Sequence, residues 1–343
     1  MKTPRRIWRA FAAPLALALI AIGMPASASA AFPGKPGPIA FQSTRAGGLS
    51  VWLVEPDGSG LRQFTPGGGG DRKPRALQYS PSISPDGRRL AYVGADAKGG
   101  QTWSNLFVKG IEVQALNQPG RPIFRRPMPR RIESVTFDGS GRRLIFSAVT
   151  PDGGDFELFS VRTDGRGLKQ LTRNDIQDIE PTASRAGLIA FTQNFERGKP
   201  AQALFGRSNL ALIRPGSRAA RPLTKGPDEN RDPDFAPSGT RVVYEHYSRG
   251  GSGAGRIDEI VLRSLRSQTI FEGSRQETTF DDPHSPAYSP SGKELVIDRS
   301  VRDELGQIVN PTLFVLNGAD PRPILDSNGE YDTDPNWGPK PRK

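Results

Sequence analysis

Acidic residues recur along the chain about every fifty positions, each time beside or just before a proline. The members of this acidic set are Asp178 and Glu180, Asp232, Asp281 and Asp282 followed by His284, and Asp332 and Asp334. Together they could coordinate a hard cation such as Ca²⁺, which prefers several oxygen ligands, or receive a basic peptide. The competing interpretation, which we favour, is that each carboxylate caps a turn and hydrogen-bonds local backbone.

His284, beside Asp281 and Asp282, is the one constellation that resembles acid–base machinery, because histidine titrates near neutral pH. The chain has two histidines and no cysteine, which excludes thiolate catalysis, disulfides and cysteine-ligated metals. It contains neither a G-x-S-x-G nor an H-E-x-x-H motif. We therefore expect no catalytic residue, no metal and no cofactor, and keep a lyase or hydrolase as the alternative.

A second candidate site is basic. Arg125, Arg126, Arg130 and Arg131 stand close together with prolines between them, which keep such a segment extended. Guanidinium groups bind phosphate or carboxylate bidentately, so this segment could recognise an anionic polymer or an acidic protein surface. The alternative, favoured by the general behaviour of charge runs, is a connection that merely faces water.

These residues belong to a repeating unit. A short strand, a tight turn around glycine and a strongly apolar strand recur at residues 81–93, 135–146, 181–191, 233–244 and 286–297. A third strand follows each time, and then a fourth that ends in an apolar residue. These endings lie about 52 residues apart on average. Four antiparallel strands joined by hairpins form one blade of a β-propeller.

The ends of the repeat complete each other. Residues 39–41, 50–54 and 61–65 match the second, third and fourth strands, and the missing first strand appears at residues 334–338. Sharing one blade between the two termini leaves no open sheet edge. We predict an all-β, six-bladed propeller of four-stranded antiparallel blades at residues 38–338, after a linker at residues 31–37 and before a basic tail at residues 339–343.

The direction of the strands assigns the loops to two faces. Turns between strands one and two, and between strands three and four, share a short-turn face. The two-to-three loops and the blade-to-blade connections share the other, which we call the long-loop face. Its longest segments are residues 66–80, 94–104, 125–133, 193–208, 246–257, 272–285 and 299–311. Binding sites concentrate in long loops on rigid scaffolds. We therefore expect binding here, with the acidic set around the mouth of the central channel.

The first thirty residues have the features of an export signal. A basic start precedes a short apolar run at residues 10–24, and Ala28, Ser29 and Ala30 form a cleavage pattern. We expect a periplasmic or extracellular protein after cleavage near Ala30. The mature chain should be monomeric and without a transmembrane segment. An uncleaved anchor and twin-arginine export remain alternatives.

The formal net charge of the chain is +11, and it falls to about +7 without the four basic residues of the signal. For an exported protein, such a charge favours anionic cell-wall polymers or acidic proteins as partners over nucleic acid.

The repeats also resemble a known family. Ser84-Pro85-Asp86-Gly87, and the Asp-Gly runs at residues 57–65 and 164–172 that end in Phe-Thr or Leu-Thr, resemble the propeller repeats of TolB and its relatives. The resemblance covers residues 38–338 and implies an exported, protein-binding propeller of the cell envelope. The mixed α/β domain that precedes the TolB propeller has no counterpart at residues 31–39. The expected function is a non-enzymatic scaffold that binds an envelope or secreted protein, with a glycan or anionic-polymer binder as the alternative.

Overall fold

The computed structural model describes most of the chain after residue 30. The described residues are 31–66, 77–98, 101–112, 120–126, 128, 131–150, 154–195, 206–217, 219–249, 254–274, 280–302, 308–318, 320–326 and 330–341. In these ranges the regular elements are β-strands, without a helix. The expected all-β class is therefore confirmed. The export signal and Arg130 lie outside the described residues.

The strands follow one another in groups of four. The first sheet contains β1 (Pro36–Ser43), β2 (Ser50–Val54), β3 (Arg62–Gln63) and β24 (Asp332–Pro339). The next two groups are β4 (Leu77–Ile83), β5 (Arg89–Lys98), β6 (Gln101–Gly110), β7 (Arg121–Pro122), and β8 (Ile132–Phe137), β9 (Arg143–Val149), β10 (Phe156–Arg162), β11 (Lys169–Gln170).

Three more groups complete the chain. They are β12 (Gln177–Ala183), β13 (Ile189–Asn194), β14 (Ser208–Ile213), β15 (Arg221–Pro222); β16 (Glu229–Phe235), β17 (Arg241–Tyr247), β18 (Arg256–Val261), β19 (Arg266–Glu272); and β20 (Phe280–Tyr288), β21 (Leu295–Arg302), β22 (Ile308–Asn317), β23 (Asp320–Pro323).

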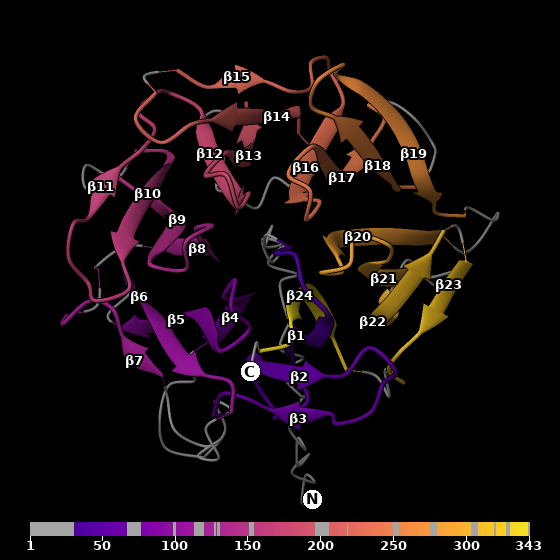
Figure 1. Cartoon of the computed structure of the whole chain (residues 1–343), viewed down its shortest axis with the longest axis horizontal. Helices are drawn as coiled ribbons and strands as arrows, with labels where there is room; N and C mark the ends of the chain where they lie inside the picture. Colours follow the sequence, from indigo (N-terminus) through magenta and orange to yellow (C-terminus); the bar gives the residue numbers. More distant parts are fainter. Residues whose placement is uncertain are drawn as a thin grey trace, which may run out of the picture.

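Within each group the pairing is antiparallel, as in a propeller blade. A single parallel pair, Ser208 with Glu229, joins the β12–β15 group to the β16–β19 group, so the two form one hydrogen-bonded sheet. Figure 1 shows the sheets around a common centre, with β4, β8, β12, β16, β20 and β24 innermost. The sheets pack face to face through buried apolar side chains, and the structure is a propeller.

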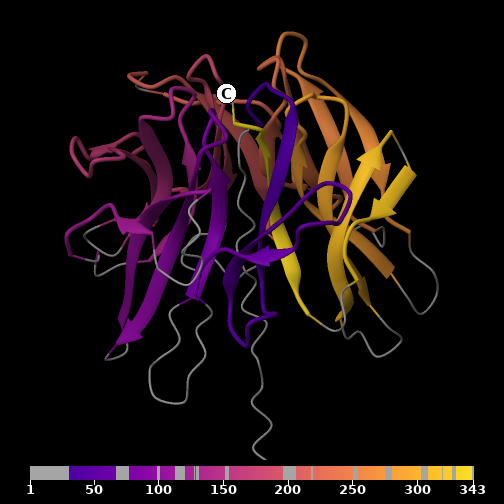
Figure 2. The ribbon, with the colours of Figure 1, turned by 60° about the horizontal axis from the view of Figure 1, so that its bottom comes forward.

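The two ends of the described chain meet in one sheet, as the sequence predicts. β24 pairs with β1, with Trp337 opposite Ile39. The Trp337 side chain is buried and its indole Nε1 donates to the Gly37 carbonyl oxygen at 3.0 Å. The yellow and indigo strands lie side by side in Figure 2.

Every innermost strand has an irregularity where its pairing with the second strand shifts register. In five of these strands the described residue at the shift has a positive φ: Ser80, Glu180, Asp232, Ser285 and Asp334. A β-bulge places one extra residue in the strand and leaves its N–H without a ladder partner. A left-handed backbone also costs a non-glycine residue about 1–2 kcal/mol.

Side chains of the preceding sheet accept from four of these five N–H groups. Glu180 Oε2 accepts from Asp232 N at 3.0 Å. The same contact recurs at 2.6 Å from Ser285 N to Glu245 Oε1, at 3.1 Å from Asp334 N to Asp298 Oδ1 and at 3.3 Å from Ser80 N to Gln42 Oε1. The bulges thus connect neighbouring sheets around the centre.

One predicted loop is wrong. We expected residues 94–104 to form a long loop, but β5 and β6 continue as a paired hairpin through Lys98 and Gln101. Gly94 was the first residue of that predicted loop. In the structure it pairs with Asn105, and a Cβ on it would lie 2.5 Å from the Phe107 ring, so glycine makes room for an aromatic side chain. The loop predicted at residues 299–311 is also shorter, because β21 extends to Arg302 and β22 begins at Ile308.

Gly87 allows a test of the shared terminal sheet. It lies in the β4–β5 turn with φ +71°, and a Cβ there would clash with the Pro339 carbonyl oxygen at the end of β24. Gly47 has φ +74° but open space around it. We expect Gly47→Ala to lower the free energy of unfolding by about 1 kcal/mol. Gly87→Ala should cost roughly 1–3 kcal/mol more, because β24 must move. Urea unfolding measures both, and equal losses would contradict the contact.

Candidate functional site

A group of buried charges lies where β16, β17 and β20 meet near the centre of the ring. Arg231 of β16 pairs in register with Glu245 of β17, and its Nε lies 2.7 Å from Glu245 Oε2. Its Nη1 lies 3.5 Å from Glu229 Oε1, and its guanidinium is 5.7 Å from the centre of the Tyr247 ring. With His284 and Glu180, these residues form what we call the central ionic cluster.

His284 connects the cluster to β20. Its Nδ1 lies 3.0 Å from the Tyr247 hydroxyl and 3.7 Å from Glu245 Oε1. Burial alone would lower the pKa of His284, but the Glu245 carboxylate raises it above the ordinary value. Burial opposes ionisation of Glu245, yet Arg231 and His284 hold the pKa of Glu245 below its usual range. A charged carboxylate thus lies between two cations, which compensates its desolvation.

Glu180 and Asp232 form the acidic end of the same region. Burial raises the pKa of Glu180 to about 7, although Arg231 and hydrogen bonds from Thr192 and the Asp232 N–H oppose this. Burial, followed by the nearby Glu180 charge, raises the pKa of Asp232 well above its ordinary value. Among the described residues, neither oxygen of the Asp232 carboxyl has a hydrogen-bond partner. The region can therefore hold protons near neutral pH.

Other members of the acidic set have hydrogen-bond or ion-pair partners, most of which are side chains. Asp178 accepts from Asn174 Nδ2 at 2.9 Å and from Gln193 Nε2 at 3.0 Å. Asp282 Oδ1 accepts from the Gly255 N–H at 2.9 Å. Asp332 is buried and pairs with Arg45, whose Nε lies 3.0 Å from Asp332 Oδ1. These carboxylates hold turns in place and are not free for a ligand.

The described members of the set do not assemble into a cation site. Glu180, Asp232 and Asp334 were expected around the mouth of the central channel; they lie at bulges of inner strands and are buried. Within the described ranges, no group of three or more carboxylate or imidazole side chains has an arrangement suited to a metal ion. The side chain of Asp281 lies outside what the structure describes.

The basic segment divides into exposed and packed members. Arg125 and Arg126 are exposed after β7. Arg131 is half-buried, and its guanidinium lies 5.8 Å from the centre of the Phe156 ring, in cation–π contact. The structure therefore brings Arg125 and Arg126 to the surface and places Arg131 against the sheet.

The sequence pattern did not single out Glu229, Arg231, Glu245 or Tyr247 as site residues. The available signal was alternation: Glu229 and Arg231 on one strand, and Glu245 and Tyr247 on the next, occupy alternate positions that face the same way. Charges at alternating positions of inner strands are unusual unless they pair.

The chain is similar to known proteins in part of its sequence and in its fold. No model of a protein family matches the chain. Over 150 residues the chain is 27% identical to a protein called Protein TolB homolog from Chlorobium luteolum, a match that covers 43% of this chain and 29% of that one. The fold also resembles the crystal structure of TolB from Acinetobacter baumannii, with a TM-score of 0.61 and 17% identity. This match covers 93% of this chain and 69% of the TolB chain. The chain is a TolB-like β-propeller.

An enzyme shares the fold. Oligogalacturonate lyase from Vibrio parahaemolyticus is similar with a TM-score of 0.53 and 14% identity, over 88% of this chain and 78% of that one. Likeness at this identity concerns the fold, which hosts many functions. The match to the Chlorobium luteolum protein spans less than a third of that protein's length. In the described part of the TolB-like propeller, no helix is long and apolar enough to cross a membrane.

Arg231 should stabilise the folded protein by compensating the carboxylates of the central ionic cluster. Arg231→Met leaves Glu245 and Glu229 without their buried cation, and we expect a loss of about 3–5 kcal/mol in the free energy of unfolding. Adding Glu245→Gln removes the uncompensated charge and should recover part of that loss. Urea unfolding of both single variants and the double variant measures the coupling. Additive effects would show that the pair does not interact.

Glu133 of β8 supplies a pH test. It is 1% exposed, and burial raises the pKa of Glu133 to about 8, although Arg131 opposes this. The folded protein therefore holds this proton more tightly than the unfolded chain, where the pKa is about 4.3. The stability it contributes is complete below that pH and is lost as the pH rises towards 8.

Glu133→Gln, which keeps the neutral form, should equal the parent near pH 4. At pH 8 it should exceed the parent by on the order of 4 kcal/mol. Urea unfolding across this pH range measures the difference, with Glu272→Gln on the exposed strand β19 as the control. A pH-independent difference between Glu133→Gln and the parent would contradict the shift.

Proposed function

We propose that this TolB-like propeller is an exported, non-enzymatic scaffold that recognises a protein partner through its long-loop face. The observation that carries the proposal is a pair of exposed apolar side chains at the start of two adjacent inner strands. Tyr331, just before β24, is 45% exposed, and Leu77, the first residue of β4, is 41% exposed. Both stand at the long-loop end of their strands, and β24 packs beside β4. Partly exposed aromatic residues often anchor protein interfaces.

The backbone that carries Tyr331 is held by several contacts. The Tyr331 N–H donates to Thr44 Oγ1 at 3.1 Å, and its carbonyl oxygen accepts from the Thr44 N–H at 3.3 Å. Thr44 Oγ1 in turn donates to Glu330 Oε2 at 2.6 Å, and Arg45 pairs with Asp332. An anchor held in place before binding loses little conformational entropy on association, which favours affinity.

The exposed Arg125 and Arg126 would lie in the rim of the same face. Charges at a rim act mainly on the rate of association with an oppositely charged surface, and that effect weakens with salt. This supports a partner with an acidic surface around an apolar centre. The same two residues support the second candidate, an anionic cell-wall polymer, whose binding would depend on Arg125 and Arg126 and not on Tyr331.

We infer further that the ring has six blades. Each group of four strands is then one blade, including the sheet that β24 and β1 share, and the single parallel pair between β14 and β16 joins two separate blades. The proposal that the protein is not an enzyme is supported by the internal contacts of His284, whose Nδ1 already faces Tyr247 and Glu245.

The test compares two pairs of apolar substitutions on opposite faces. Immobilised mature protein would capture partners from an envelope extract, and the affinity of each identified partner would be measured with purified variants. Leu77→Ser with Tyr331→Ser should weaken binding at least about tenfold, because an apolar anchor is lost. The matched control, Leu168→Ser with Leu265→Ser, changes exposed residues in turns of the short-turn face and should bind like the parent.

Other outcomes distinguish the alternatives. If both double variants bind the partner equally well, Leu77 and Tyr331 are not part of the protein-binding site. Retention of isolated cell-wall polymer that is lost in Arg125→Gln with Arg126→Gln, and at high salt, would support the polymer binder instead.

A further inference from the structure

The first described residues, 31–35, pack into the middle of the ring. Ala31 and Phe32 are 3% and 1% exposed and belong to two different apolar clusters, Ala31 with Ala236 and Tyr288 and Phe32 with residues of β8 and β9. The Gly34 N–H donates to the Pro290 carbonyl oxygen at 3.1 Å. In Figure 1 the indigo segment that leads into β1 runs through the centre. The segment expected to be a linker is therefore packed on several sheets.

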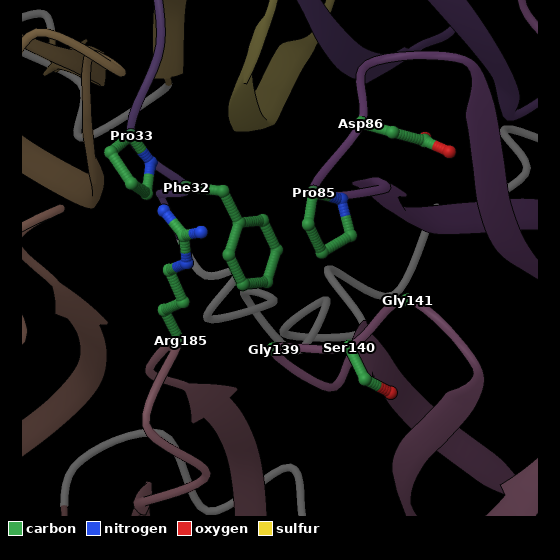
Figure 3. Close-up of a pocket in the computed structure, with 8 residues that line it drawn as sticks. All are labelled: Phe32, Pro33, Pro85, Asp86, Gly139, Ser140, Gly141 and Arg185. Atoms are coloured by element: carbon green, nitrogen blue, oxygen red, sulfur yellow. The ribbon is translucent and has the colours of Figure 1, made fainter.

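Phe32 and Pro33 also line a hollow of about 180 Å³ on the short-turn face, together with residues of three turns. Figure 3 shows the Phe32 ring between Pro85 and the Arg185 side chain. The segment lies at the short-turn end of the centre.

The backbone N–H of Ala31 points to Asp234, a fully buried carboxyl on β16. Its other donors are neutral: Thr182 Oγ1 at 3.2 Å, the Tyr288 N–H at 2.8 Å and the Phe235 N–H. Among the described residues, no lysine, arginine or histidine lies within ion-pair distance of Asp234. Burial raises the pKa of Asp234 well above its ordinary value, against the effect of these hydrogen bonds. Ionising a buried carboxyl without a nearby cation costs desolvation free energy. A positive charge at the position of Ala31 N would offset that cost.

The cleavage pattern at Ala28, Ser29 and Ala30 would supply that charge. Hydrolysis of the Ala30–Ala31 peptide bond by a signal peptidase consumes one water and leaves a carboxylate on Ala30 and an α-amine on Ala31. A free α-amine has a pKa of about 7.7–8.0 and is mainly protonated at neutral pH. A nitrogen that donates one N–H as an amide then carries three N–H donors and a full positive charge.

We propose that removal of residues 1–30 creates a buried ion pair between the α-ammonium of Ala31 and the Asp234 carboxylate, which fixes the new N-terminus inside the ring. Ala31 is thus a processing site whose product completes the core. Residues that precede Ala31 would leave an uncharged amide at Asp234. This inference is independent of the partner proposed above and rests on the expected export.

The test uses the full mature chain with two forms of the N-terminus. One begins at Ala31, released from a fusion partner without residual residues, and the other carries Gly-Ser before Ala31. Each is made with Asp234 and with Asp234→Asn. Unfolding midpoints in urea are measured, together with the rate at which an amine-reactive reagent labels the N-terminus, read by peptide mass spectrometry. Asp86→Asn, in the pocket beside Phe32, is the matched control.

We expect the Gly-Ser extension to lower the midpoint with Asp234 and to change it little with Asp234→Asn. Labelling of Ala31 in the folded mature chain should be at least about tenfold faster with Asp234→Asn than in the parent or the Asp86→Asn control. If Asp234→Asn does not fold, the urea midpoints of the mature chain and the Gly-Ser extended chain, both with Asp234, still test the proposal. The proposal is wrong if the extended and mature chains unfold at the same midpoint, or if Ala31 of the mature parent is labelled as fast as the extended terminus.

Discussion

The structure depends on one recurring constraint: the bulged inner strands leave N–H groups that only the neighbouring sheet can satisfy. Side chains such as Gln42, Glu180 and Glu245 reach from one sheet to the bulge of the next. A second set of contacts lies two residues beyond the bulges and runs in the same direction around the ring. Asn336 accepts from the Ile83 N–H, Ser82 from the Phe137 N–H and Asp234 from the Tyr288 N–H. Because buried backbone donors must be paired, each sheet fixes the position of the next.

This constraint explains why titratable groups collect around the centre. A side chain that accepts a backbone N–H in a buried site needs an oxygen, and Asp, Glu, Asn, Gln, Ser and Thr all provide one. The inner strands carry Ser and Asn as well as Asp and Glu at such positions. Where carboxylates accumulate, Arg231 and His284 compensate part of the charge, and burial raises the pKa of the others.

The repeated glycine turns and apolar strands were enough to predict the propeller and the pairing of residues 334–338 with the first strand. The capping interpretation of the acidic set stays a prediction: Asp282 accepts from a backbone N–H, whereas the contacts of Asp178 and Asp332 are with side chains. The central ionic cluster was not predictable, because His284 reaches Glu245, the partner of Arg231, only when two repeats pack together. The hairpin around Gly94 was missed for a related reason: a glycine that makes room for Phe107 looks the same in sequence as a glycine in a turn.

The pairing of Ile39 with Trp337 also determines the order in which the protein can fold. β1 pairs with β2 early in synthesis, but its other edge stays open until β24 has been made, almost three hundred residues later. Contacts this distant in sequence form late, because closing so large a loop costs entropy before any bond is gained. The last strand therefore acts as a quality check, since a truncated chain keeps an unpaired edge that is prone to aggregation and proteolysis.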